Sequence, residues 1–162
     1  MSNAAKFGKV AVLFGGKSAE RAVSLDSGQA VLEALLRSGV QAEAFDPQAR
    51  SVTELVGYDR AFIVLHGRGG EDGQIQGVLE WLNLPYTGTG VQGSAIGMDK
   101  VKTKQVWQGS DLPTAPYRII TKDSDLDAVV ADLGLPVIIK PVHEGSSVGM
   151  SKVEKAEDFV SQ

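Results

Sequence analysis

The most informative stretch of this chain reads Leu135-Pro-Val-Ile-Ile-Lys-Pro-Val-His-Glu-Gly-Ser-Ser-Val-Gly149. Its apolar run, Val137–Ile139, predicts a buried strand that Lys140 ends and that Pro141 keeps from pairing further. The glycines and serines at 145–149 leave backbone N–H groups accessible, and such groups bind phosphate oxygens in a concave loop. A fixed cation followed by this loop predicts a phosphate site, with ATP as the expected ligand.

Two further polar glycine loops follow apolar strands. Ala61-Phe-Ile-Val-Leu65 precedes His66-Gly-Arg-Gly-Gly-Glu-Asp-Gly73, and Val10-Ala-Val-Leu-Phe14 precedes Gly15-Gly-Lys-Ser-Ala-Glu20. Ligands of open α/β sheets bind beyond the carboxyl ends of the strands, where such loops converge. We therefore expect the site in one crevice at this edge of the sheet.

The composition is that of an ordinary globular protein, with 43% hydrophobic and 22% charged residues among 162. A net charge of −4 without a basic cluster argues against nucleic acid as a partner. The absence of cysteine excludes disulfides, thiolate nucleophiles and cysteine-bound metals. Because no apolar run approaches the roughly 20 residues that span a bilayer and no signal-peptide core follows Met1, we expect a cytoplasmic protein without a membrane partner.

Hydrophobic periodicity predicts alternating strands and helices. Such alternation favours a parallel sheet with right-handed crossovers. Gly28 is expected to allow its helix to approach the sheet closely. The expected strands are Lys9–Phe14, Gln41–Phe45, Ala61–Leu65, Pro85–Thr87, Tyr117–Ile120, Val137–Lys140 and Met150–Val153; the expected helices are Arg21–Arg37, Gly73–Leu82, Gly93–Met98, Lys100–Gly109, Ser124–Leu133 and one that begins at Ala156.

The pattern changes near Pro113 and Pro116, which bracket an exposed connection. We expect an N-terminal α/β substrate domain over residues 7–99, a connecting helix and linker over 100–116, and the first part of a second domain over 117–162. The last predicted helix has only about seven residues, fewer than the roughly 12–15 that an isolated helix needs. The sequence is therefore interpreted as a piece of a longer protein.

Two familiar nucleotide-binding patterns lack their structural context. Gly88-Thr-Gly-Val-Gln-Gly93 fits the dinucleotide pattern but follows a weak strand, and no acidic residue ends a second strand about 20 residues later. Gly16-Lys-Ser18 resembles the end of a Walker A loop, yet Ala11 stands where its first glycine is required. Neither pattern is taken as a binding motif.

Four charged or titratable residues each allow a structural and a functional interpretation. Glu20 at a helix start either interacts with the helix dipole or binds a substrate ammonium. His66 is either a structural hydrogen-bonding group or one that orients a carboxylate or amine. Lys100 and Lys140 are ordinary surface lysines when taken singly, but together they would neutralise a triphosphate from two sides.

The motifs resemble those of the D-alanine–D-alanine ligase family, which belongs to the ATP-grasp superfamily. The resemblance runs in order along nearly the whole chain. It implies an open parallel-sheet N-terminal domain, pre-ATP-grasp and Rossmann-like, followed by an incomplete ATP-grasp central domain. The matching segments are Val12-Leu-Phe-Gly-Gly-Lys-Ser-Ala-Glu-Arg21, Val23-Ser-Leu25, Leu65-His-Gly-Arg-Gly-Gly-Glu-Asp-Gly73, Leu84-Pro-Tyr-Thr-Gly88, Met98-Asp-Lys100 and Lys140-Pro-Val-His-Glu-Gly-Ser-Ser-Val-Gly-Met150.

The resemblance implies a role for each site residue. Glu20 would hold the ammonium of the first D-alanine and, with Ser146, form the catalytic network that ends in a tyrosine outside this chain. His66 would line the same subsite. The loop His143–Gly149 would be a mobile cover over ATP. The implied ATP contacts are Lys100, Lys140, Glu144, Gly145, Ser146, Ser147 and Val148.

The implied reaction joins two D-alanines through an acyl phosphate at the expense of ATP, in the synthesis of peptidoglycan precursors. The family uses Mg²⁺ or Mn²⁺, whose ligands would lie in a C-terminal part that this chain lacks, so the 162-residue piece itself is expected to be inactive. A cytoplasmic homodimer is expected, with D-alanine and ATP as its small-molecule partners. The alternatives are another ATP-grasp ligase, such as a D-alanine–D-lactate ligase, or a non-catalytic nucleotide-binding module.

Overall fold

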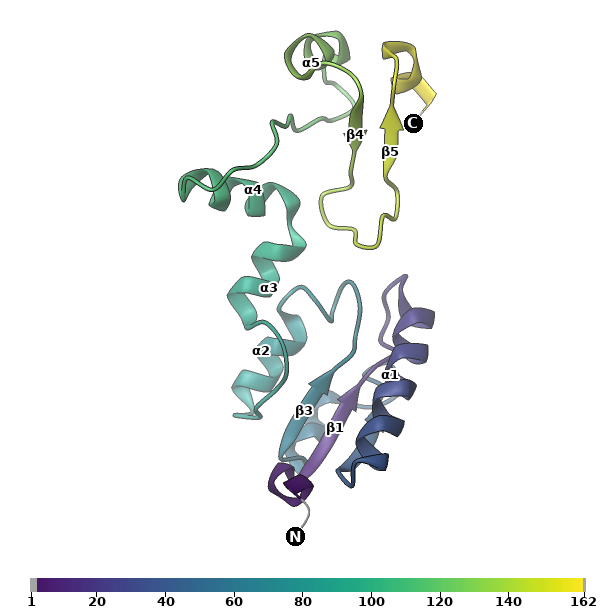
Figure 1. The fold of residues 1–162 in the computed structure, drawn as a ribbon, viewed down its shortest axis with the longest axis vertical. Coiled ribbons are helices and arrows are strands. Elements are labelled where there is room, and N and C mark those ends of the chain that lie inside the picture. Colours follow the sequence, from purple (N-terminus) through teal and green to yellow (C-terminus); the bar gives the residue numbers. More distant parts are fainter. Residues whose placement is uncertain (1–2, 162) are drawn as a thin grey trace. The chain divides into compact units, whose positions relative to one another are not determined.

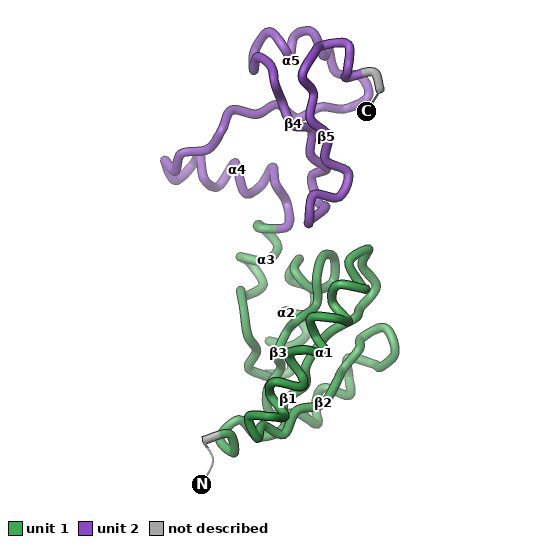
Figure 2. The backbone as a smooth tube through the Cα atoms, turned by 45° about the vertical axis from the view of Figure 1, so that its right-hand side comes forward, with its two compact units in different colours: residues 1–97 green, residues 98–162 purple. Residues whose placement is uncertain are grey.

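A computed structural model of the chain describes residues 3–161 (Figure 1). The chain falls into two compact units, residues 1–97 and 98–162 (Figure 2). Within the described part of the chain, no helix has the length and apolar character needed to cross a membrane.

Unit 1 is built on a three-stranded parallel sheet of order β2-β1-β3. The central strand β1 (Lys9–Leu13) pairs with β2 (Gln41–Phe45) on one side and with β3 (Arg60–Ile63) on the other. The parallel sheet predicted from the sequence is therefore confirmed. The other elements are the 3-10 helices η1 (Asn3–Phe7) and η2 (Val52–Gly57), and the α-helices α1 (Arg21–Arg37), α2 (Gln74–Trp81) and, at the boundary of the unit, α3 (Val91–Met98).

Alternate residues of β1 point into two separate hydrophobic cores, as the pleat of a strand requires. Ala11 and Leu13 belong to the core that includes Leu79 of α2. Val10 and Val12 belong to the core that includes Leu32 of α1. Because both faces of the parallel sheet are covered, β1 reads as a continuous apolar run in the sequence.

Helix α1 lies so close to the end of β1 that only glycine fits at position 28. A Cβ atom there would stand 2.2 Å from both Cβ and Cγ of Phe14. Gly28 and Phe14 are both buried. The close helix–sheet approach expected from the sequence is confirmed.

The outer edge of β3 carries a single bridge where the sequence predicted the strand Pro85–Thr87. Ala61 pairs with Tyr86: its N–H donates to the Pro85 oxygen at 2.9 Å, and its oxygen accepts from Thr87 N at 3.2 Å. Proline has no N–H to extend the ladder, which accounts for the short pairing. Thr87 Oγ1 then accepts from Ile63 N at 3.0 Å.

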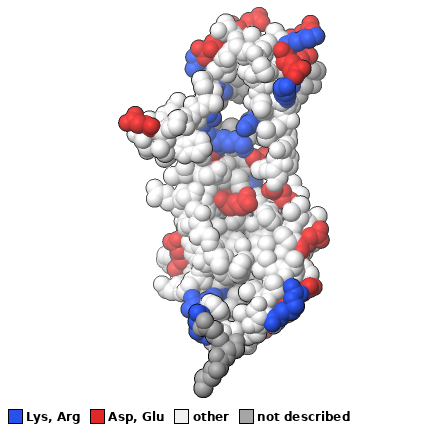
Figure 3. Space-filling view, viewed as in Figure 1, with Lys and Arg blue, Asp and Glu red and all other residues white. Residues whose placement is uncertain are grey.

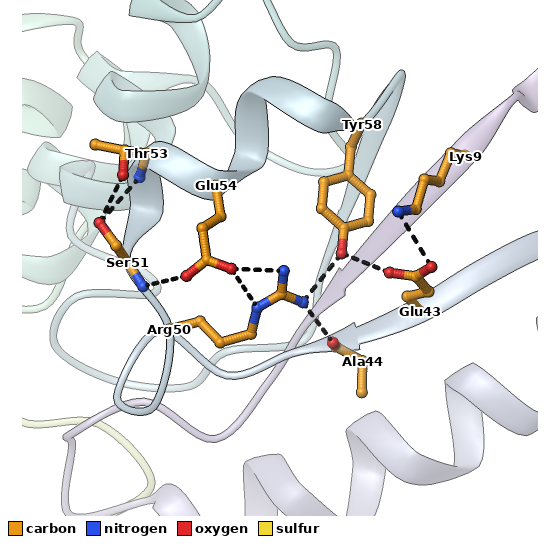
Figure 4. Close-up of polar contacts among 8 residues, drawn as sticks. All are labelled: Lys9, Glu43, Ala44, Arg50, Ser51, Thr53, Glu54 and Tyr58. Carbon is orange, nitrogen blue, oxygen red and sulfur yellow. Dashed lines mark hydrogen bonds and ion pairs between the residues drawn. The ribbon is translucent and has the colours of Figure 1, made fainter.

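The opposite edge, along β2, carries a polar network (Figure 4). The Arg50 guanidinium donates to Glu54 Oε2 at 2.9 and 3.0 Å and to Tyr58 Oη at 3.1 Å. Tyr58 Oη donates to Glu43 Oε2 at 2.8 Å, and Lys9 Nζ pairs with Glu43 Oε1 at 3.1 Å. Charged side chains of this kind discourage pairing of an edge strand with another chain.

Unit 2 contains an antiparallel strand pair and helices. Strand β4 (Val137–Ile139) pairs with β5 (Ser151–Val153), and Val137 lies opposite Val153. Val153 and Phe159 are buried. The helices are α4 (Lys100–Gly109), α5 (Leu126–Leu133) and the 3-10 helix η3 (Ala156–Ser161).

The predicted strand Tyr117–Ile120 is wrong, because the segment adopts no regular secondary structure. Within residues 3–161, β4 pairs with β5 alone, so the segment has no strand beside it to satisfy its backbone. Side chains hold it instead: Lys104 Nζ lies 5.0 Å from the Tyr117 ring, and Arg118 pairs with Asp132 at 2.7 Å.

Candidate functional site

The first candidate site lies in unit 1, where the loops that follow β1 and β3 meet. Ser18 Oγ donates to the main-chain oxygen of His66 at 2.7 Å, and Glu20 N donates to Ser18 Oγ at 3.2 Å. One hydroxyl thus ties the two loops together. The predicted convergence of these two strand-end loops is therefore present in the structure.

The side chain of Glu20 is turned toward the β3 loop. Glu20 is the N-cap residue of α1, yet its side chain forms no cap hydrogen bond. A Cβ atom at Gly67 would stand 2.6 Å from Glu20 Oε2, and Gly67 has a φ of +66°. The Glu20 carboxylate therefore lies beside the backbone next to His66, and the positive φ at position 67 favours glycine there. The role of Glu20 in binding a substrate ammonium stays a prediction.

Two polar side chains flank the imidazole of His66. Nε2 lies 3.1 Å from Ser27 Oγ, and Nδ1 lies 3.6 Å from Glu71 Oε1. Ser27 Oγ already donates its proton to Val23 O at 2.7 Å, so the hydroxyl oxygen accepts from His66 Nε2–H. Ser27 is therefore a fixed acceptor for the ring and is not poised as a nucleophile.

A buried serine of α1 connects the ends of β1 and β3 next to this site. Ser24 is completely buried; its hydroxyl donates to Val64 O at 2.7 Å and accepts from Gly15 N at 2.9 Å. The two strand ends and α1 are thereby joined by one side chain. Because a buried polar group without a partner is costly, this bridge fixes the backbone under the loops.

An ion pair fixes the loop 15–20, which follows β1. Arg21 pairs with Asp46 at 2.7 Å, and Asp46 also accepts from Gly16 N at 3.0 Å. Burial alone would raise the pKa of Asp46, but the hydrogen bonds from Arg21 and from the backbone outweigh burial and lower it. The loop 15–20 is thus anchored by a carboxylate that stays ionised.

The second candidate site lies in unit 2, where the start of α4 meets the loop 140–150, called here the β4–β5 loop. Lys100 N donates to Val142 O at 3.1 Å, and Lys100 Nζ donates to the main-chain oxygen of Glu144. Asp99 Oδ2 lies 3.3 Å from His143 Nε2. Three consecutive loop residues therefore contact two consecutive residues of the helix start.

The remainder of the β4–β5 loop is a tight run of turns. Val148 N donates to Gly145 O at 2.9 Å, and Met150 N donates to Ser147 O at 3.2 Å. Ser146 and Ser147 have φ values of +47° and +63°. Such left-handed backbone is uncommon outside glycine and is often found at ligand-binding segments. The predicted contacts Gly145, Ser146, Ser147 and Val148 all lie in this loop.

Lys140 follows β4 directly, as expected, and is exposed. Within residues 3–161 its ammonium forms no ion pair or hydrogen bond. Lysines 100, 102 and 104 lie along the first half of α4, and Figure 3 shows basic side chains gathered in the part of unit 2 that holds α4 and the β4–β5 loop. This side of unit 2 suits an anionic ligand.

The structure thus brings together Glu20 with His66 in unit 1, and Lys100 with Glu144 in unit 2. The link from Glu20 to Ser146 stays a prediction, since these residues belong to different units. Asp99 was not foreseen; its signal in the sequence is an aspartate directly before a helix. Among residues 3–161 no cluster of three or more acidic, histidine or cysteine residues could hold a metal ion.

Two family models match the chain. The model described as D-ala D-ala ligase N-terminus matches residues 38–89, and the model described as D-ala D-ala ligase C-terminus matches residues 106–162. Together they cover more than half of the sequence. The two matches flank the boundary between the units.

Curated relatives are similar over almost the entire chain. A D-alanine–D-alanine ligase of Acinetobacter baumannii is 91% identical over 161 residues, which cover 99% of this chain and 52% of the relative. A D-alanine–D-alanine ligase of Psychrobacter is 64% identical over 153 residues, which cover 94% of this chain and 46% of the relative. The chain therefore spans about half the length of these relatives.

Solved structures show the same likeness. The D-alanine–D-alanine ligase of Bacillus anthracis has a TM-score of 0.82 at 31% identity, covering 94% of this chain and 51% of that chain. The same organism's ligase complexed with ATP has a TM-score of 0.79 at 29% identity, covering 95% of this chain and 53% of that chain. The ligase of Coxiella burnetii has a TM-score of 0.78 at 26% identity, covering 94% and 58%. The chain belongs to the D-alanine–D-alanine ligase family.

Proposed function

We propose that the protein to which this chain belongs is an ATP-dependent ligase that joins two molecules of D-alanine. The observation that carries the proposal is the 91% identity with the Acinetobacter baumannii D-alanine–D-alanine ligase over 161 residues. The two candidate sites supply the chemistry that this reaction needs. One offers a carboxylate beside an imidazole, and the other offers lysines beside a small-residue loop.

The site in unit 1 is proposed to bind the first D-alanine. The Glu20 carboxylate would pair with its ammonium, while His66, whose ring lies between Ser27 and Glu71, would line the same subsite. A charge-assisted hydrogen bond of this type is stronger than a neutral one and has a defined direction. The close packing of Glu20 against Gly67 would keep the carboxylate at a fixed place.

The site in unit 2 is proposed to bind the phosphates of ATP. Lys100 and Lys140 would neutralise them, and backbone N–H groups of residues 144–148 would bind their oxygens. The γ-phosphoryl group would pass to the carboxylate of the first D-alanine, with ADP leaving. The amine of the second D-alanine would then attack the acyl carbon, and inorganic phosphate would leave with formation of the peptide bond. Phosphoryl transfer depends mainly on positioning and charge neutralisation, which these groups supply.

The metal requirement is proposed to be met outside this chain. Residues 3–161 contain no group of three or more His, Cys, Asp or Glu side chains that could hold a metal ion. The divalent ion would screen the phosphates when bound. Its ligands are proposed to belong to the part of the family's length that this chain does not span.

The proposed setting is the cytoplasm, where a homodimer would supply D-alanyl-D-alanine for peptidoglycan precursors. Residues 7–99 would form the substrate domain, 100–116 the connection and 117–162 the first part of the ATP-grasp central domain. Exposed apolar side chains of unit 1, Trp81 at 87% and Val56 at 73%, provide surface for self-association. Light scattering of the complete protein tests the dimer.

The decisive experiment measures the complete natural protein with ATP and D-alanine. We expect ADP and phosphate to form only when D-alanine is present, and mass spectrometry to detect D-alanyl-D-alanine. L-Alanine is the matched control substrate, and D-lactate tests the alternative second substrate. ATP turnover that does not depend on D-alanine would reject the proposal.

A further inference from the structure

We propose that Asp99 is a positioning residue that fixes Lys100 and the β4–β5 loop relative to each other, so that they bind ATP phosphates as one unit. The inference rests on the proposed function, because it assigns a role within the same nucleotide site. Asp99 itself would not touch the nucleotide. It would act through Lys100 and through His143.

The two carboxylate oxygens of Asp99 have different partners. Oδ1 accepts from Val101 N and from Lys102 N, both at 2.9 Å, and so caps α4. Oδ2 faces His143 Nε2 at 3.3 Å. One side chain therefore determines both where α4 begins and where the loop lies beside it. A hydroxyl could perform the first task but not the second.

The charge of Asp99 matters because the start of α4 is unfavourably charged. The first turn contains no acidic residue, while Lys100 and Lys102 stand at the positive end of the helix dipole. Backbone hydrogen bonding from Lys102, assisted by His143, outweighs partial burial and lowers the pKa of Asp99. The carboxylate thus offsets the repulsion that would otherwise turn the lysines away from this position.

The contacts of Lys100 depend on this arrangement. Its N–H is bonded to Val142 O at 3.1 Å and its ammonium to the main-chain oxygen of Glu144. Both acceptors flank His143, the residue that Asp99 holds. Movement of His143 away from Asp99 would therefore shift the loop backbone and change the place of the Lys100 ammonium.

The test compares two cap residues of the same unit. Asp99→Ser keeps a capping oxygen but removes the carboxylate oxygen that faces His143. Asp125→Ser changes the N-cap residue of α5, whose carboxylate accepts from Ala128 N at 3.1 Å. In the complete natural protein we expect Asp99→Ser to weaken ATP binding about tenfold, the equivalent of one lost polar contact. The KM for D-alanine should not change.

Asp125→Ser is the control for general loss of helix stability. We expect it to change ATP affinity by less than about twofold, within the range of an ordinary surface substitution. An equal loss of ATP affinity in Asp99→Ser and Asp125→Ser would overturn the inference, because both would then act through helix capping. Unchanged affinity in Asp99→Ser would overturn it as well.

A double-mutant cycle tests the connection through His143. If Asp99 acts through this ring, Asp99→Ser combined with His143→Gln should weaken ATP binding no more than Asp99→Ser alone. Additive effects would show two independent contacts and overturn the proposed link. His143→Gln leaves Lys100 and its acceptor, the main-chain oxygen of Glu144, in place.

The NMR resonances of the His143 ring can be followed without ATP. They distinguish failure of this inference from failure of the proposed function. The ring resonances of His143 are those that disappear from the spectrum of the complete natural protein in His143→Gln. Asp99→Ser should shift them and Asp125→Ser should not. If the unaltered protein binds no ATP, the proposed function fails, while an unmoved His143 resonance in Asp99→Ser refutes the Asp99 contact itself.

Discussion

The two candidate sites are built in different ways. The proposed amino-acid site of unit 1 lies on a sheet buried on both faces and is fixed by the completely buried Ser24. The proposed phosphate site of unit 2 lies on a loop between two three-residue strands and is fixed by polar contacts from the start of α4. The His143 side chain in those contacts is 54% exposed.

This difference matches what each site is proposed to bind. A small amino acid offers few atoms for recognition, so its partners must be fixed before it arrives. A triphosphate carries charge enough to reorganise a loop, and loops that close over ligands come from the less stable parts of proteins. We therefore expect substitutions in unit 1 to act mainly on stability or D-alanine binding, and those in unit 2 mainly on ATP binding.

The largest effect is expected from Gly28→Ala, which tests the packing under the amino-acid site. The added Cβ would stand 2.2 Å from the Phe14 side chain, so α1 must move away from the sheet. We expect a loss of roughly 3 kcal/mol in the free energy of unfolding, the upper part of the range for overpacked cores. Urea denaturation measures it.

Gly77→Ala in α2 is the matched control for that substitution. No atom lies within 4 Å of a Cβ at position 77, so only helix propensity changes. We expect it to stabilise the protein by up to about 1 kcal/mol. Equal effects of the two substitutions would mean that the contact of α1 with Phe14 is not rigid.

The second-largest effect is expected from Lys140→Ala, which should lower the affinity of the complete protein for ATP. Loss of one charge-assisted partner of a phosphate should weaken binding roughly 10- to 100-fold. Lys152→Ala, an exposed lysine of the same strand pair that contacts Glu154 at 2.6 Å, is the control. If both variants bind ATP alike, Lys140 is an ordinary surface lysine.

A somewhat smaller effect is expected from Glu20→Gln, which keeps the shape of the side chain and removes its charge. The KM for D-alanine should rise about tenfold while that for ATP stays unchanged, because the charge faces the proposed ammonium position. Glu33→Gln on the exposed part of α1 controls for the change in helix charge. A parallel rise in both KM values would indicate that Glu20 serves the fold instead of the substrate.

The sequence predicted those parts of the molecule that follow from local pattern. The central strand β1 was recognisable because burial on both faces makes it a continuous apolar run. The meeting of Glu20 and His66 followed from the rule that parallel strands end at one edge. Gly28 was recognisable as a site of close approach because a glycine inside a helix otherwise only destabilises it.

The failures concern features that depend on distant partners. The segment Tyr117–Ile120 has strand-like residues, but a strand exists only where another backbone lies beside it. The Asp99–His143 contact joins residues 44 positions apart, so no local pattern indicates it. The contact of Ser27 with the ring of His66 joins residues 39 positions apart, so no local pattern indicates it either.

The smallest expected effect concerns the polar network at the β2 edge (Figure 4). A hydrogen bond from Tyr58, followed by one from Lys9, lowers the pKa of Glu43, and hydrogen bonds from Arg50 and Ser51 lower that of Glu54. Carboxyl groups with lowered pKa values stabilise the folded state above their unfolded pKa. That contribution is lost as the pH falls through the lowered folded values. Acid should therefore weaken unit 1 gradually below the ordinary carboxyl range.

Tyr58→Phe tests the origin of this acid sensitivity. It removes the largest cause of the Glu43 shift while keeping the ring packed against Phe45, with which it makes an edge-to-face contact at 6.0 Å. Its melting temperature should consequently fall less steeply with decreasing pH than that of the unaltered protein, and the two should differ most above the carboxyl range. Because the Glu43 carboxylate is exposed, salt should reduce the difference. Parallel pH profiles would show that Glu43 draws its stabilisation from Lys9 and not from the phenol.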